Sequence, residues 1–402
     1  MSETTLRIAS LNGLLGYGYP RESLQRALAM QPDLLGVDAG STDPGPYYLG
    51  AGESFVSDAQ VRSDLEPALC AAVEHGLPLI VGTAGGSGAQ PHLEGLLAIV
   101  REISARHGLR FRMAVIPAEV PQATVLQALR EGRVTSCGPS HGLTEEHVRA
   151  CTRIVGQMGT EPLIEALNGG AQVIIAGRCC DAGIFAAEPI RRGFDPGLAL
   201  HMGKILECGT LAARPAGAND VLVGTIGPDW FEVEPANPAK RCTPESVAAH
   251  SLYEQPDPNC FYEPEGMVDL SGCEFEQVGE RAVRVTGSRL VPAQEQTVKL
   301  EGARACGFRA ITIAGLRDPL IIERLGEIER SVRAAVASAM AGTLAAEEFS
   351  VRFIRYGLDG VTGGIEPPPE PLPREVGLVI DALAPTQELA DRVLRSEERR
   401  VG

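Results

Sequence analysis

Residues 173–183 read VIIAGRCCDAG, a short apolar run that breaks at Gly177 and continues into Arg178 and Asp181. Val173–Ala176 is uncharged and rich in β-branched residues, which favours a buried strand of a parallel sheet. Residues just beyond the carboxyl end of such a strand face the usual ligand crevice of an open α/β sheet. The stretch therefore predicts both a fold class and the position of a functional site.

The same alternation of strand and helix extends from the amino terminus to about residue 210. Short apolar runs alternate with stretches of helical periodicity, which favours an α/β domain with a mostly parallel sheet. The expected strands are Leu6–Ser10, Leu34–Val37, Pro78–Val81, Phe111–Ile116 and Val173–Ala176. The expected helices are Arg21–Met30, Leu65–His75, Leu93–His107, Val120–Arg130, Thr144–Met158 and Glu161–Asn168, with Gly76 and Gly108 as C-terminal stops.

After about residue 215 the chain contains more proline and more alternation of apolar and polar residues. We therefore expect two domains, an N-terminal βα-repeat domain over residues 1–214 and a C-terminal α+β domain over residues 215–394. The expected elements of the second domain include a strand in Gly279–Thr286, a helix at Thr243–Tyr253 and a helix at Leu320–Ala341 that is broken once. Residues 395–402, RSEERRVG, resemble translated adapter sequence and are expected to be a non-native tail.

The composition narrows the classes of partner. The 36 Lys and Arg residues against 52 Asp and Glu give a net charge of −16, which disfavours nucleic acid and anionic membranes as partners. The amino terminus does not resemble a signal peptide, and no apolar run is long enough to span a bilayer, so we expect a cytoplasmic protein. The ten cysteines show no repeated metal-ligand spacing, and we expect reduced thiols and no metal centre built on them.

Two glycine-rich loops follow expected strands. Asn12, Gly13, Gly16 and Gly18 follow the first strand, and Gly85, Gly86 and Ser87 follow the third. Backbone amides in such loops can hold a phosphate or a carboxylate, although the same composition also makes close-packed turns. The first loop has the spacing G-x-x-G-x-G rather than a dinucleotide fingerprint, and the second lacks the Gly-Lys-Ser/Thr ending of a P-loop.

Polar residues also follow the second expected strand. Asp38, Ser41, Thr42 and Asp43 place two carboxylates and two hydroxyls there. They could orient substrate hydroxyls or hold a divalent cation. Asp43 is followed by Pro-Gly-Pro, so a capped turn is the alternative.

A third group lies on the helical stretch Leu198–Leu211. His201, Lys204 and Glu207 recur every three residues and would share one face of a helix, which suits proton transfer or carboxylate binding. The alternative is an exposed polar stripe with a modest Lys–Glu pair. Among the seven histidines, His201 is the best acid–base candidate, whereas Cys208 gains no obvious stabilisation of a thiolate.

Motifs along nearly the whole chain resemble the acyclic terpene utilisation family, AtuA. The matching segments are Leu6–Gly18, Gly177–Asp181, Gly193–Asp195, His201–Gly209, Leu252–Glu254, Val268–Gly272, Arg284–Gly287, Tyr356–Gly360 and Ala384–Ala390. The resemblance implies a cytoplasmic bacterial protein of catabolism whose branched, terpenoid or organic-acid substrates are often coenzyme A thioesters. It also implies a small partner subunit in a hetero-oligomer, and it carries no settled assignment of catalytic residues.

These observations predict a lyase or hydratase that acts on a branched carboxylate or an acyl-CoA thioester. Arg178 would bind a carboxylate through two of its guanidinium nitrogens, with Lys204 as a further substrate-binding residue, and Asp181, His201 or Glu207 would move a proton. Beyond a possible divalent cation, and coenzyme A as part of the substrate, no cofactor is indicated. The alternatives are a non-catalytic subunit that binds a metabolite or scaffolds a partner, and a nucleotide-dependent enzyme that uses the glycine-rich loops for phosphates.

Overall fold

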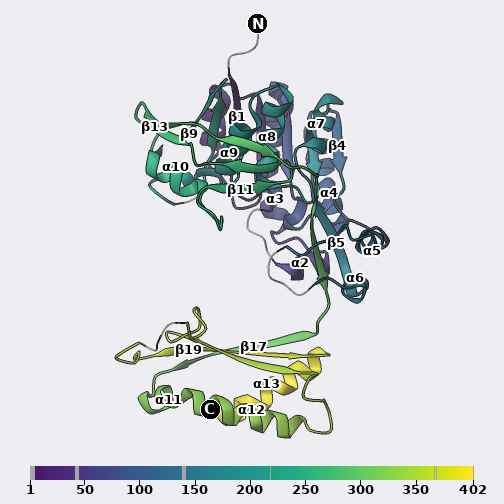
Figure 1. The fold of residues 1–402 in the computed structure, drawn as a ribbon, viewed down its shortest axis with the longest axis vertical. Coiled ribbons are helices and arrows are strands. Elements are labelled where there is room, and N and C mark those ends of the chain that lie inside the picture. Colours follow the sequence, from purple (N-terminus) through teal and green to yellow (C-terminus); the bar gives the residue numbers. More distant parts are fainter. Residues whose placement is uncertain are drawn as a thin grey trace. The chain divides into compact units, whose positions relative to one another are not determined.

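The computed structural model describes residues 5–40, 45–137, 142–217, 219–365, 367 and 369–401. The chain forms two compact units, residues 1–304 and 305–402 (Figure 1). The division therefore lies about ninety residues beyond the one expected near residue 214, because the strands that follow residue 214 join the first sheet.

The larger unit contains a nine-stranded sheet in the order β13-β14-β9-β8-β1-β2-β3-β6-β4. Five strands are mutually parallel: β1 (Leu6–Ser10), β2 (Leu34–Asp38), β3 (Leu79–Gly82), β6 (Val173–Ala176) and β4 (Met113–Ile116). Four antiparallel strands extend it: β8 (Leu222–Ile226), β9 (Trp230–Pro235), β14 (Ala282–Thr286) and β13 (Glu274–Val278). The α/β fold class is thereby confirmed, and the β8–β1 pairing explains the position of the unit boundary.

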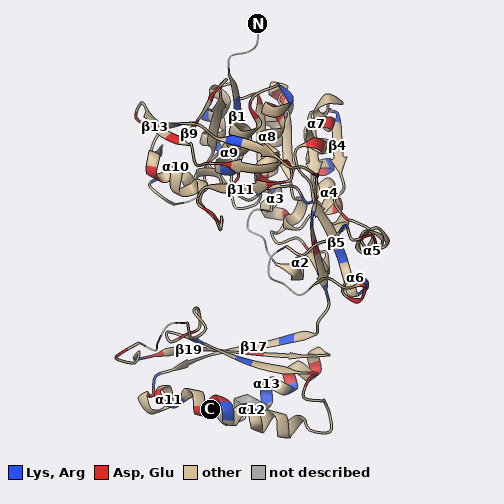
Figure 2. Ribbon diagram, in the orientation of Figure 1, with Lys and Arg blue, Asp and Glu red and all other residues tan. Residues whose placement is uncertain are grey.

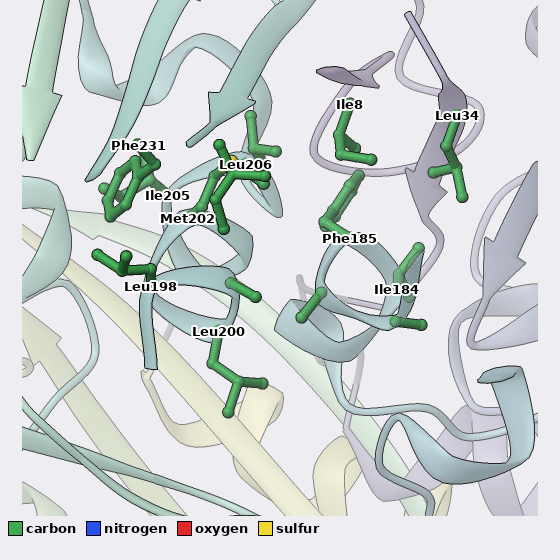
Figure 3. Close-up of a cluster of buried hydrophobic side chains, with 14 of the residues drawn as sticks. Ile8, Leu34, Ile184, Phe185, Leu198, Leu200, Met202, Ile205, Leu206 and Phe231 are labelled. Atoms are coloured by element: carbon green, nitrogen blue, oxygen red, sulfur yellow. The ribbon is translucent and has the colours of Figure 1, made fainter. Parts of the chain in front are cut away.

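Two hydrophobic cores cover the two faces of this sheet. One contains Ile8 and Ile174 and packs under α7 (Glu161–Asn168), α8 (Asp181–Arg191) and α9 (Pro196–Leu206). Figure 3 shows Ile8 and Leu34 of the sheet against Phe185 and Ile184 of α8. The other core takes the alternate strand residues under α1 (Arg21–Ala29), α3 (Asp58–His75) and α4 (Gln90–His107). Burial on both faces explains why the parallel strands are mostly apolar, with Arg7, Ser10 and Asp38 as the exceptions in β1 and β2.

The expected helix Thr144–Met158 is wrong in its second half. Thr144 caps α6 (Glu145–Ala150) through a capping box, but the chain then becomes β5 (Cys151–Gln157). The β-branched residues of β5 pair antiparallel with β16 (Lys299–Arg304), a partner about 145 residues away. Gly76 and Gly108, by contrast, end α3 and α4 in the left-handed conformation, as predicted.

Smaller elements complete the larger unit. They are α2 (Pro46–Ala51), α5 (Gln122–Arg130), the short pair β7 (Ala213–Arg214) and β10 (Arg241–Cys242), α10 (Pro244–Ser251), and the sheet of β11 (Cys260–Glu263), β12 (Gly266–Asp269) and β15 (Arg289–Pro292). Thr243 caps α10 with a capping box, so the helix expected at Thr243–Tyr253 is confirmed and begins at the expected residue.

The smaller unit is an antiparallel sheet of β17 (Phe308–Leu316), β19 (Val376–Ala384) and β18 (Ser350–Tyr356) with α11 (Pro319–Glu323), α12 (Leu325–Met340) and α13 (Gln387–Val401). The break expected in Leu320–Ala341 falls at Arg324, and α13 runs through most of the residues expected to be a tail. Charged residues of both signs are interspersed along the elements of both units (Figure 2). Within the described residues, no helix combines the length and the apolarity that a membrane span requires.

Candidate functional site

The loops at the carboxyl ends of β1, β2, β3 and β6 are joined by backbone and side-chain hydrogen bonds. Leu15 N donates to Asp38 O at 3.0 Å, and Ala39 N donates to Gly82 O at 2.9 Å. The Thr83 hydroxyl then bonds both backbone groups of Cys179, at 3.1 and 3.2 Å. The strand-end edge predicted from the sequence is therefore one connected surface, as open α/β sheets require for a ligand crevice.

Arg178 lies in this edge with its guanidinium already occupied. Its Nε and Nη2 lie 3.0–3.2 Å from the carboxylate of Glu301 on β16, and its Nη1 donates to Thr83 at 3.3 Å. Only 7% of the Arg178 side chain is exposed. Burial opposes the charged form, yet Asp181 and Glu301 raise its pKa above the ordinary value. The two guanidinium nitrogens of Arg178 that were expected to bind a substrate carboxylate bind Glu301 instead.

Asp181 is the first residue of α8 and a partly exposed acid of the cluster. Its Oδ1 lies 3.5 Å from Arg178 Nη1, and 22% of its side chain is exposed. Burial raises the pKa of Asp181, although the charges of Arg178 and Lys204 oppose the rise. A carboxyl group whose pKa is raised in this way binds a proton more readily than a solvated aspartate, as a general acid or base requires.

Lys204 and Glu207 form a buried ion pair on α9, with 6% and 5% of their side chains exposed. The Lys204 ammonium donates to the Glu207 carboxylate. Burial lowers the pKa of Lys204, but Glu207 more than restores it, so the ammonium stays charged. Burial raises the pKa of Glu207 against the attraction of Lys204. Lys204 and Glu207 therefore form a buried pair, and the exposed polar stripe that was the alternative is wrong.

A second acid comes from β11. The Cys180 thiol donates to the carboxylate of Glu263, and burial raises the pKa of Glu263 to about 8. Burial also raises the pKa values of Cys179, Cys180 and Cys208. These thiols are therefore protonated at neutral pH, and a cysteine nucleophile finds no support in this cluster.

Backbone strain is concentrated at the same place. Within the described residues, the non-glycine residues with positive φ are Gln31 (57°), Thr83 (55°) and Glu254 (64°). Gln31 follows α1, where a left-handed residue commonly ends a helix. Thr83 is held by Arg178 and Cys179, and Glu254 acts electrostatically on Asp181 and Lys204. Strained conformations of this kind persist where the surroundings impose them, and they cluster at functional sites.

The first glycine-rich loop is bound from inside the protein. Asp64 of α3 accepts hydrogen bonds from Gly16 N at 2.7 Å, Gly18 N at 2.9 Å and Asn12 Nδ2 at 3.1 Å. Gly13 allows a close approach, because a Cβ there would lie 3.1 Å from the Cys208 backbone. The amides at Gly16 and Gly18 therefore already hold an anion, while the fully buried Asn12 Oδ1 accepts no hydrogen bond from the described residues.

The second loop also satisfies its own amides. Gly86 N donates to Thr83 O at 3.1 Å, and Gly88 N donates to Ala84 O at 2.9 Å. Gly85 and Gly86 line a small apolar pocket together with Leu15, Ala39, Val56, Val61, Leu96 and Ile99. Ser87 is buried beside them. The pocket suits a small hydrocarbon group better than a phosphate.

Asp38 is buried at the end of β2, where its Oδ1 accepts from Gly40 N at 2.9 Å. This bond closes a short turn that the side chain of Asp38 makes with its own backbone, while the turn expected at Asp43 lies outside the described residues. The charge of Asp38 also raises the pKa of Arg178, which places it in the cluster. Ser41, Thr42 and Asp43 lie outside the described residues. Within the described residues, no group of three or more His, Cys, Asp or Glu side chains is placed to hold a metal ion.

His201 lies in the hydrophobic core. Its ring nitrogens are each 2.8 Å from a serine hydroxyl, Ser288 and Ser251, and the rings of Phe231 and Phe261 lie 5.2 and 6.3 Å away. Burial lowers its pKa to about 3, so the imidazole is neutral and has no solvent-exposed surface. The helical spacing that placed His201 with Lys204 could not distinguish the core from the crevice.

Three residues of the cluster were missing from the candidates that the sequence suggested: Glu254, Glu263 and Glu301. Glu263 and Glu301 come from β11 and β16, whose positions depend on long-range pairing. The anchor of the first loop, Asp64, did leave a signal, because it lies on the same face of α3 as the apolar residues Val61, Leu65 and Ala68.

A comparison with protein families finds one match. The model of the family described as "Acyclic terpene utilisation family protein AtuA" matches residues 54–219 and 233–400. These segments include the ends of β3 and β6, α9 and most of the smaller unit. No curated protein and no solved structure matches the chain.

Proposed function

Because the chain belongs to the acyclic terpene utilisation family AtuA, we propose that it is a catabolic enzyme of the lyase or hydratase type. Its substrate is a branched carboxylic acid derivative, either the acid itself or an acyl-CoA thioester. The observation that carries this proposal is Asp181, a partly exposed carboxyl of raised pKa held beside two buried cations at the strand-end edge. Proton transfer next to a carbonyl needs an acid–base group of this kind.

The reaction would proceed as follows. Asp181 takes the proton from the carbon next to the carbonyl, and the C–H electron pair moves toward the carbonyl oxygen. The Lys204 ammonium stabilises the negative charge on that oxygen, since a fixed cation in a poorly solvated site acts strongly on developing charge. The electron pair on the carbonyl oxygen then returns and forms a double bond between the two carbons, while the C–O bond to a hydroxyl on the second carbon breaks. The protonated Asp181 donates its proton to that hydroxyl, which leaves as water, and the Asp181 carboxylate is restored. Hydration is the reverse sequence.

Other residues support these steps. Arg178, bound to Glu301, holds Asp181 in place rather than binding substrate. Asn12 Oδ1 is a buried acceptor that receives no hydrogen bond from the described part of the chain, which suits the hydrogen of a water molecule or a substrate hydroxyl. The apolar pocket beside Gly85 and Gly86 would take a branching methyl group. His201 has no part in this mechanism, because its environment is entirely that of the core.

One observation favours a second candidate, a non-catalytic subunit that binds a metabolite or supports a partner. The ion pairs Arg178–Glu301 and Lys204–Glu207 are complete without a ligand, as structural pairs would be. The nucleotide-dependent alternative has less support, because the amides at Gly16 and Gly18 are bound by Asp64.

Deuterium exchange separates the two candidates. The protein is incubated in deuterated water with 3-methylbutanoyl-CoA, and incorporation at the carbon next to the carbonyl is followed by mass spectrometry. The proposal predicts incorporation by the wild-type protein and a loss of at least 100-fold in Asp181→Asn. Exchange that is absent in the wild-type protein, while the thioester still raises the melting temperature, would support the non-catalytic subunit.

A further inference from the structure

A second cavity lies between the last turns of α4 and the start of β4, at one edge of the nine-stranded sheet (Figure 1). Its volume is about 430 Å³, within the range of sites for small molecules. Met113, the first residue of β4, lines it and pairs with Val173, the first residue of β6. The candidate functional site follows the last residue of β6, so the cavity lies at the opposite end of the parallel strands.

The end of α4 builds the apolar wall of this cavity. Gly108 adopts the left-handed conformation, with a φ of 65°, and stops the helix. Leu109 N then donates to Ser104 O at 2.9 Å, which turns the chain back along the helix. Leu109, Phe111 and Met113 are half-buried and pack against the core on the α4 side of the sheet. Part of each of these side chains therefore stays exposed toward the cavity.

Two arginines provide the charge of the cavity. Arg101 of α4 and Arg110 of the following loop both line it and are exposed. Within the described residues, neither guanidinium has an ion pair or a hydrogen bond. Arg106, on the same helix, is by contrast bound to Glu66 at 3.2 Å and to Glu102 at 2.6 Å. The described lining contains no carboxylate, so both guanidinium groups can contact a ligand.

This lining selects a class of ligand. Guanidinium groups only donate hydrogen bonds, and their planar geometry matches the oxygens of a carboxylate or a phosphate. The hydroxyl of Ser104 donates to Val100 O at 2.6 Å, so its oxygen is left as an acceptor. The half-buried apolar side chains gain stability when a hydrocarbon group covers them. A ligand that satisfies the whole lining therefore combines an anionic group with a hydrocarbon group.

We propose that this cavity binds a small organic anion. Its carboxylate or phosphate contacts Arg101 and Arg110, and its hydrocarbon part covers Leu109, Phe111 and Met113. The ligand is a second one, bound apart from the substrate of the proposed function, and the inference does not depend on that function. The strand-end edge already pairs both of its cations, whereas the cations of this cavity have no carboxylate among the described residues.

Four probes separate the contributions of charge and hydrocarbon. Benzyl phosphate and phenylacetate carry both groups and distinguish a phosphate from a carboxylate. Phenylacetamide has nearly the shape of phenylacetate without its charge, and inorganic phosphate has the charge without the hydrocarbon. Calorimetry at low ionic strength measures the binding of all four, because salt screens exposed charges.

The variant that tests the site is Arg101→Gln/Arg110→Gln. Both side chains are exposed, so the substitutions leave the core unchanged, and an unaltered melting temperature shows that the variant folds. The matched control is Arg26→Gln. Arg26 is an exposed arginine of α1 that also has no ion pair within the described part of the chain, and it does not line the cavity.

The expected result depends on both groups of the ligand. Wild type binds benzyl phosphate, phenylacetate or both with a Kd below about 1 mM. The double variant binds the same anion at least tenfold more weakly, since hydrogen bonds to charged groups are among the stronger ones. Arg26→Gln binds it as wild type does. Phenylacetamide and inorganic phosphate bind wild type more weakly than the better of the two organic anions, and that anion identifies the charged group of the ligand.

Contrary results overturn the inference at separate points. If wild type binds neither organic anion, the cavity is not a site for this class of ligand. Equal binding by wild type and the folded double variant places the anion elsewhere on the protein. Binding of phenylacetamide as tight as that of the anions removes the role of the arginines. Binding of inorganic phosphate as tight as that of benzyl phosphate removes the role of the apolar wall. None of these results bears on the proposed function.

Discussion

Replacing Lys204 with methionine measures how strongly the ammonium holds Glu207 ionised. Methionine keeps an unbranched apolar chain of similar length, so the variant removes the charge with little loss of packing. Removing one partner of a buried ion pair costs about 3–5 kcal/mol. Both side chains are nearly inaccessible, which places this pair in that class. Glu207 can reduce the cost by taking up a proton, because burial already raises its pKa.

The loss of stability should therefore depend on pH. The folded-state pKa of Glu207 exceeds the unfolded value of about 4.3 in both proteins, and it is higher in the variant. Below both folded-state values the stability gap is small. Between them, the gap in the free energy of unfolding grows by about 1.4 kcal/mol per pH unit, since only the variant still binds the proton. A loss of 3–5 kcal/mol corresponds to a pKa difference of about two to four units.

Urea unfolding between pH 5 and pH 9 measures this gap. The sequence contains a single tryptophan, Trp230 in β9, so its fluorescence reports on the larger unit. The double variant Lys204→Met/Glu207→Gln has no carboxyl group at residue 207 to titrate. The difference in free energy of unfolding between wild type and this double variant should therefore not widen with rising pH. A gap between Lys204→Met and wild type that stays constant from pH 5 to pH 9 would refute the reasoning. Glu207 would then carry its proton in the wild-type protein as well.

Three further predictions concern residues around the site. Asp64→Ala should lower the free energy of unfolding by about 1–3 kcal/mol, since it leaves three buried donors unpaired, and Asp58→Ala on the exposed start of α3 serves as the control in urea melts. The wild-type protein should lose stability as the pH falls from 6.5 toward 3, because His201 binds a proton in the unfolded chain but stays neutral in the folded core. The stability of His201→Gln should depend less steeply on pH over this range. An identical slope in the two proteins would contradict the placement of His201 in the core. Arg178→Met should raise the pKa values of Asp181 and Glu301, because both carboxylates lose their cationic partner. The free energy of unfolding of this variant should therefore fall more steeply with rising pH than that of wild type. Parallel plots of stability against pH for the two proteins would count against these contacts.

The sequence predicted the parallel half of the fold well because its signal is local. The bounds expected for the first and last strands, Leu6–Ser10 and Val173–Ala176, agree with β1 and β6. Those runs are short and mostly apolar, and glycines such as Gly76 and Gly108 stop the helices between the strands. β5 was mistaken for helix because its apolar residues also fit a helical period, and its pairing with β16 leaves no local trace.

The candidate site was predictable where it follows a strand, as Arg178 does, or where it keeps a helical spacing, as Lys204 and Glu207 do. Arg178 and Asp181 could be found because β6 ends just before them, and parallel strands bring such ends to one edge. Glu301 could not be found, since it reaches Arg178 from a strand 123 residues away. The role expected for Arg178 changed for that reason, from binding a substrate to fixing Asp181. A residue type can indicate a site, but the partners decide what its charge does there.

The energetically unfavourable features of this protein are gathered in one place, and their position supports a functional site there. A fold selected for stability alone would place hydrocarbon where Lys204 and Glu207 lie, because well-packed apolar residues often replace a buried ion pair without loss. It would also have glycine at Thr83 and Glu254, where a left-handed backbone is strained for other residues. These unfavourable features are gathered around the exit of β6, while the rest of the sheet is packed with ordinary apolar residues. Proteins retain such costs where activity depends on them. Glu254→Gly and Lys204→Met/Glu207→Met should therefore fold at least as stably as wild type and should lose the function of the site.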